Sequence, residues 1–175
     1  MKEIDMTRRE GPLGVALVEL SSKRKQKYIV RTDIQPYQTE EANGVTFIEQ
    51  HFDYKPSIDE IKEFVIGVID CQTDEKILNS YVFTPEGAEE PIIVWLSKEN
   101  QTNFSEAHRL QIVPIKFKLN ETADKEAIYH EFTTFAELDR FYKGGVQYIN
   151  QCLNEGWLKK DGIDFSEYEH QLNIL

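Results

Sequence analysis

The sequence predicts an α+β fold in which helices alternate with β-hairpins, and two observations support this prediction. Ser57 with Glu60 and Thr134 with Glu137 have the spacing of capping boxes, which begin helices by satisfying free backbone amides. Between the boxes, short runs of strand-forming residues come in pairs separated by turn residues. The predicted order is helix, hairpin, helix, hairpin, helix with a small antiparallel sheet, preceded by a short N-terminal β-hairpin.

The N-terminal part, residues 1–54, is predicted to be a leader followed by a strand pair. Residues 1–12 are charged and end in Gly-Pro, which is typical of a flexible segment, and residues 13–20 fit either a strand or a short helix. Residues 28–34 and 45–52 are rich in β-branched and aromatic side chains. They are therefore predicted to pair as a hairpin.

The remaining residues, 55–175, are predicted to form one α+β core domain. Apolar residues at helical spacing predict the helices, and short β-branched or alternating runs predict the strands. The run 92–96 is apolar throughout and is predicted to be buried on both faces. The expected helices are 57–72, with a break at 73–75, 97–111 and 135–159, and the expected strands are 80–84, 92–96, 113–119 and 127–133.

The last predicted helix has an unusually wide apolar surface. One stripe runs from Phe135 to Trp157, and a second stripe lies beside it. Gly144 and Gly145 lie in the middle of this helix, where glycine costs about 0.5–1 kcal/mol relative to alanine, so we expect another backbone to approach closely there. Since one small sheet cannot cover both stripes, the second is a candidate partner-binding face. It consists of Phe141, Gly145, Tyr148 and Cys152.

Charge and composition exclude several classes of protein. With 31 acidic and 20 basic residues the net charge is −11, which repels a phosphate backbone and argues against a nucleic-acid partner. The chain has no apolar run long enough to span a membrane and no signal-peptide pattern, and two cysteines do not make a disulfide framework. We therefore expect a soluble, cytoplasmic protein without a membrane partner.

The sequence has no pattern that predicts catalysis or a cofactor. Its four histidines are scattered, and none has the close His or Cys partner that metal sites need. It also lacks a phosphate loop and a nucleophile elbow. We therefore predict no catalytic residue, no metal, no cofactor and no enzymatic activity. The alternative is a ligand site assembled from distant aromatic and imidazole groups near the hairpins: Tyr81, Trp95, His108, Tyr129 and His130.

Several short strings carry a resemblance to a known family. Asn79-Ser80-Tyr81-Val82-Phe83, then a turn, then Val94-Trp95-Leu96-Ser97 entering a helix, resembles a domain of unknown function encoded by phages and prophages. That domain is found in tail-fibre and tail-fibre-assembly-type proteins, and the resemblance covers residues 55–170. It implies a role around the phage tail, and it brings no catalytic residues with it.

The sequence thus predicts a non-enzymatic, tail-associated or assembly accessory protein that acts through protein–protein contacts. The expected partner is a phage tail or tail-fibre component, and a second copy of the chain is also open. Association with the virion is the alternative to a cytoplasmic location. A small ligand-binding domain or enzyme is the alternative function.

Overall fold

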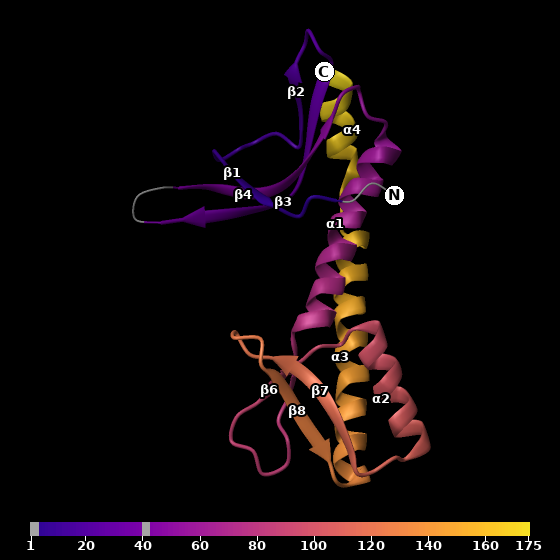
Figure 1. The fold of residues 1–175 in the computed structure, drawn as a ribbon. Helices are drawn as coiled ribbons and strands as arrows, with labels where there is room; N and C mark the ends of the chain where they lie inside the picture. The colour runs from indigo at the N-terminus through magenta and orange to yellow at the C-terminus, as the bar shows by residue number, and fades with distance from the viewer. Residues whose placement is uncertain (1–3, 40–42) are drawn as a thin grey trace. The chain divides into compact units, whose positions relative to one another are not determined.

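The computed structural model confirms an α+β fold and describes residues 4–39 and 43–175 (Figure 1). The chain divides into two compact units, residues 1–71 with 158–175 and residues 72–157. Each unit has its own hydrophobic core. The elements are β1 (Arg8–Gly11), β2 (Val18–Ser22), β3 (Lys27–Gln38), β4 (Asn43–Phe52), α1 (Ile58–Asn79), β5 (Tyr81–Phe83), β6 (Ile92–Val94), α2 (Lys98–Leu110), β7 (Ile115–Glu121), β8 (Ala127–Phe132), α3 (Phe135–Asp161) and α4 (Phe165–Ile174).

The first unit is built on a four-stranded antiparallel sheet with the order β1-β4-β3-β2. The predicted pairing of residues 28–34 with 45–52 is confirmed as the central pair β3–β4. The segment 1–12 was predicted to be flexible, but it contains β1, whose residues pair with Val45–Ile48 of β4. The Arg8 side chain helps to hold this strand, because it donates to Asp33 Oδ2 at 2.5 Å and to Thr46 Oγ1.

The core of the first unit lies where α4 and the first part of α1 meet the sheet. Val30, Ile48, Val65 and Val68 are almost completely buried in it. The helix α4, which the sequence analysis did not predict, contributes Tyr168 and Leu172 to this core and packs beside β2 (Figure 1). The Tyr168 hydroxyl donates to the carbonyl oxygen of Arg31 at 3.0 Å, and burial raises the pKa of this phenol.

The two compact units divide the chain differently from the boundary placed after residue 54. Residues 58–71 of α1 and residues 158–175 belong with the N-terminal strands. The physical reason is burial, since Ile61, Val65 and Val68 of α1 pack in the same core as the sheet. A β-sheet with one apolar face must bury that face against another element, and here α1 supplies part of the cover.

The second unit contains two short hairpins, β5–β6 and β7–β8, together with α2 and α3 (Figure 1). The Trp95 amide donates to the Leu119 carbonyl oxygen at 2.8 Å, which joins β7 to the chain just after β6. The core is aromatic: the Phe141 ring contacts Phe83, Phe104 and Phe132 at centroid distances of 4.8–4.9 Å. This core holds the hairpins and α2 against α3.

Three details of the predicted elements are corrected. The helix α1 continues through residues 73–75 to Asn79, without a break. The strand β6 is not buried on both faces, since Ile93 is 50% exposed while Val94 is fully buried. The second predicted capping box is only half formed. The Glu137 amide donates to the Thr134 hydroxyl, but the Glu137 carboxylate bonds the Glu86 amide and His130 instead of the Thr134 amide. The Ser57 box, by contrast, is confirmed: the Glu60 amide donates to Ser57 Oγ at 3.2 Å, and the Ser57 amide donates to Glu60 Oε2 at 2.8 Å.

Gly144 is needed because a side chain, rather than a backbone as predicted, approaches the helix α3. The Tyr81 hydroxyl donates to the Phe141 carbonyl oxygen at 2.9 Å. A Cβ on Gly144 would lie 2.5 Å from the Tyr81 hydroxyl oxygen. At Gly145 the nearest atom would be Tyr81 Cε1 at 3.6 Å, which is an ordinary contact. The two adjacent glycines therefore have different roles.

We expect Gly144→Ala to destabilise the protein and Gly145→Ala to leave it unchanged or slightly more stable. The first substitution displaces the buried Tyr81 ring and should cost about 1–3 kcal/mol. The second adds a compatible methyl group and should gain up to about 1 kcal/mol from helix propensity. Urea denaturation of both variants measures the difference. In a Tyr81→Phe background the cost of Gly144→Ala should shrink, and equal effects at the two glycines would contradict this account.

Candidate functional site

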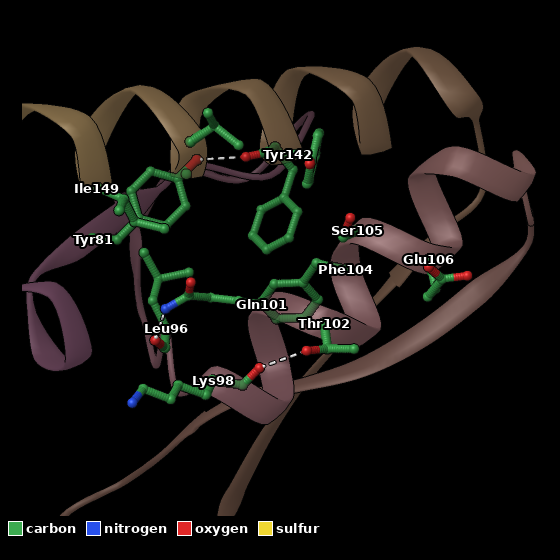
Figure 2. A pocket seen from close by; sticks show the side chains of 13 residues that line it. Tyr81, Leu96, Lys98, Gln101, Thr102, Phe104, Ser105, Glu106, Tyr142 and Ile149 are labelled. Carbon is green, nitrogen blue, oxygen red and sulfur yellow. Dashed lines mark hydrogen bonds between the residues drawn. The ribbon is translucent and has the colours of Figure 1, made fainter.

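The second unit has a cavity of about 470 Å³ between α2 and α3, here called the α2–α3 groove (Figure 2). Figure 2 shows Tyr81 and Ile149 on one side, facing Leu96, Gln101 and Phe104 on the other. The lining residues are Tyr81 from β5, Leu96 after β6, Lys98, Gln101, Thr102, Phe104, Ser105 and Glu106 from α2, and Phe141, Tyr142, Gly145, Val146 and Ile149 from α3.

The lining residues recur every three or four positions along α2 and α3, which places them on one face of each helix. The lining positions on α2 extend from Lys98 to Glu106, and those on α3 extend from Phe141 to Ile149. At 1.5 Å per residue, each set covers about 12 Å, or slightly more than two turns. The groove is thus bounded by one face of each of two helices, and its length matches two turns of a third helix.

Several polar groups of the groove already have partners within the chain. Gln101 Nε2 donates to the Leu96 carbonyl oxygen at 2.6 Å, and the Thr102 hydroxyl donates to the Lys98 carbonyl oxygen at 2.9 Å. The Tyr81 hydroxyl is bonded to α3, and burial raises the pKa of this phenol to about 12. Because these groups are satisfied, the inner surface that remains for a ligand or partner is mainly apolar.

The two charged side chains of the groove differ in their partners. Glu106 is bound by Arg109, at 2.6 Å for the shorter of two contacts, and this guanidinium lowers the pKa of the carboxyl group. No ion pair joins the Lys98 ammonium to another residue in the described part of the chain. The groove therefore has one neutralised acid and one available cation, at opposite ends of the lining positions of α2 (Figure 2).

The predicted partner-binding face is largely covered by the chain itself. Phe141, Gly145 and Cys152 are buried, and the Tyr148 hydroxyl donates to the Lys76 carbonyl oxygen at 3.0 Å. Phe141 and Gly145 nevertheless line the α2–α3 groove. The exposed apolar residues of α3 include Val146, which is 39% exposed and is not one of these four residues.

The five side chains of the predicted ligand cluster have separate neighbours. Tyr81 lines the groove, whereas Trp95 and Tyr129 lie under the ammonium groups of Lys118 and Lys116, respectively. His108 stacks on Tyr142, and His130 contacts Phe132 edge-on. Across residues 4–39 and 43–175, no hydrogen bond or ring contact joins two of these five side chains.

Both core-facing histidines are paired with carboxylates. His108 Nε2 lies 2.8 Å from Asp139 Oδ1, and the Asp139 pKa is lowered by Lys143 and then by His108. His130 Nε2 lies 3.1 Å from Glu137 Oε1, which also accepts the Glu86 amide at 2.9 Å. A carboxylate next to imidazole can orient a general base. Here, however, the Glu137 carboxylate also ties the loop after β5 to the start of α3, which is a structural role.

We expect Glu137→Ala to lower the free energy of unfolding by about 2 kcal/mol, because the Glu86 amide and His130 lose a buried acceptor. Glu137→Gln keeps an acceptor oxygen at the same position and should cost less than half as much. Glu131→Ala, on the exposed side of β8, is the control. Thermal and urea denaturation measure the series. A glutamine variant as unstable as the alanine variant would show that the charge, rather than the acceptor, is required.

The described residues contain no group of three or more His, Cys, Asp or Glu side chains able to hold a metal ion. Both cysteines are free thiols. Among the described helices, none is long and apolar enough to cross a membrane.

Sequence reasoning identified Phe141 and Gly145 but missed the α2 side of the groove. The signal was present, since Gln101, Thr102, Ser105 and Glu106 fall on one face of a predicted helix. These residues are polar or charged, so hydrophobic periodicity alone does not select them.

Comparison of the chain with models of protein families, with curated proteins and with solved structures found no match.

Proposed function

We propose that this chain is a non-enzymatic accessory protein of a phage or prophage tail, and that it binds a protein partner through the α2–α3 groove. The tail assignment rests on the resemblance of residues 55–170 to a phage-encoded domain. The mode of action rests on a single observation, the open groove of about 470 Å³ with its mainly apolar lining.

The chemistry of the groove supports a protein contact. Aromatic and aliphatic side chains make up much of its lining, while Gln101 Nε2 and the Thr102 hydroxyl are bonded to backbone carbonyl oxygens. Binding energy at protein interfaces is concentrated in such well-packed apolar pockets. Val146, which is 39% exposed, adds accessible apolar surface to the groove.

Affinity capture with two matched valine variants tests this proposal. Val146→Gln removes apolar surface from the groove, whereas Val82→Gln makes the same change at an exposed position on β5, outside the groove lining. From cells producing the phage or prophage, the wild-type chain and the Val82 variant should retain a tail-fibre or baseplate protein, and the Val146 variant should lose it. Capture of no tail component, or genes for a metabolic pathway on both sides of the coding gene, would contradict the proposal.

The partner of the groove could also be a second copy of the chain. Light scattering at increasing protein concentration measures whether the chain forms dimers. A dimer that Val146→Gln dissociates and Val82→Gln preserves would place self-association at the groove.

The second candidate function is binding of a small molecule, and the size of the groove favours it. Ligand pockets generally have volumes of about 300–1,000 Å³ and mainly apolar walls. Thermal-shift screening with small amphiphilic compounds tests this function. A stabilising compound whose effect Val146→Gln abolishes would support it, and a screen without such a compound would count against it.

A further inference from the structure

We propose that the occupant of the α2–α3 groove is a short amphipathic helix of the partner protein, and that this helix carries an acidic side chain beside its apolar anchors, facing Lys98. The inference rests on the proposed function, because it specifies the partner segment for the same groove. Three properties of the groove lead to it: its shape, its apolar interior and its uneven charge.

The shape favours a helix over an extended peptide. The groove is bounded by about 12 Å of two helices, and a third helix placed there can pack against both. Amphipathic helices dock in such grooves through apolar side chains at positions i, i+3 or i+4, and i+7. An extended peptide would instead leave most of its backbone amides and carbonyl groups unpaired against Phe104, Val146 and Ile149.

The charge favours an acidic residue at one end. Glu106 is neutralised by Arg109, whereas the Lys98 ammonium has no ion-pair partner in the described part of the chain. A carboxylate on the docked helix would pair with Lys98, and a basic residue there would be repelled. Because Lys98 lies at the edge of the groove (Figure 2), its contribution is to selectivity, and the apolar anchors supply most of the affinity.

Two synthetic peptides test the inference. Each is about 16 residues long, so that it is partly helical in water, and each carries leucines at positions i, i+3, i+4 and i+7 in an Ala/Gln background. One has Glu residues flanking the leucines and the other has Lys residues at the same positions. Affinities for the full chain are measured by fluorescence anisotropy at about 0.15 M salt, where the field of the net charge of −11 is screened beyond about 8 Å, together with binding of decanoate as a small amphiphile.

The acidic peptide should bind about three- to fivefold more tightly than the basic peptide. Lys98→Glu should reverse the order of the two peptides, and added salt should reduce the preference. Val146→Gln should weaken both peptides, while Val82→Gln should leave both affinities unchanged. Circular dichroism of each variant checks that it is folded.

The other outcomes separate this inference from the proposed function. Equal binding of the two peptides, sensitive to Val146→Gln, would overturn the acidic partner helix and leave the groove as a protein contact. Binding insensitive to Val146→Gln would place the peptides elsewhere and overturn the inference. Binding of decanoate alone would overturn both the helical occupant and the protein-contact function, in favour of a small ligand.

Discussion

Phe141→Ala should cost the second unit about 3–5 kcal/mol of unfolding free energy, which is the usual cost of removing a buried phenylalanine side chain. Phe141 is 1% exposed and its ring contacts Phe83, Phe104 and Phe132. These rings come from β5, α2 and β8, so a single truncation creates a cavity where three elements meet α3. Neighbouring rings cannot fill it without leaving their own contacts.

Tyr129→Ala is the matched control for this prediction. Tyr129 is 55% exposed and the Lys116 ammonium lies over its ring, so the change should cost less than about 1 kcal/mol. Urea denaturation followed by Trp95 and Trp157 fluorescence measures both variants. A cost for Phe141→Ala near that of Tyr129→Ala would show that the aromatic cluster does not hold the unit together.

Arg31→Met should cost the first unit about 3 kcal/mol, because it leaves the largely buried Glu49 carboxylate without its guanidinium partner. The Arg31 side chain is 8% exposed and lies 2.8 Å from Glu19 Oε2 and 3.3 Å from Glu49 Oε2. It also donates to the Ala16 carbonyl oxygen at 3.2 Å, and its guanidinium lies over the Phe47 ring. Arg31 thereby links β3 to β4 and to the chain around β2.

Two further variants show whether charge is the cause. Glu49→Gln in the Arg31→Met background should recover part of the lost stability, since the carboxylate left uncompensated at Glu49 is only 16% exposed. Arg24→Met makes the same substitution at an exposed position and should change stability by less than about 0.5 kcal/mol. If the double variant is no more stable than Arg31→Met alone, the role of Arg31 is packing against Phe47 rather than charge compensation.

Local patterns in the sequence were enough to predict most helices and strands. The Ser57 box marked the start of α1 correctly because a capping box acts over four adjacent residues. Strand β8 was also placed correctly, since Ile128 and Phe132 face inward while Tyr129 and Glu131 are exposed. No observation tests the predicted tail-related function or the predicted partner, so both stay predictions.

The missed elements depend on residues far apart in the chain. Strand β1 has charged residues and no apolar alternation, and it forms because β4 offers an unpaired edge. Helix α4 has only ten residues, too few for a stable isolated helix, and it is held by burial of Tyr168 and Leu172. Strand β1 therefore could not be found from propensity, whereas the Asp164 cap of α4 was a local signal that the sequence analysis did not use.

For the candidate site, the sequence by itself determined that α3 has more apolar surface than one sheet can cover. The tertiary structure decided which part of that surface is available. Phe141 and Cys152 became buried core, while Val146 remained exposed beside α2. The physical reason is that periodicity defines the face of a helix but not what packs on it. The groove exists only because residues 98–106 and 141–149, distant in sequence, were brought together by the aromatic core around Phe141.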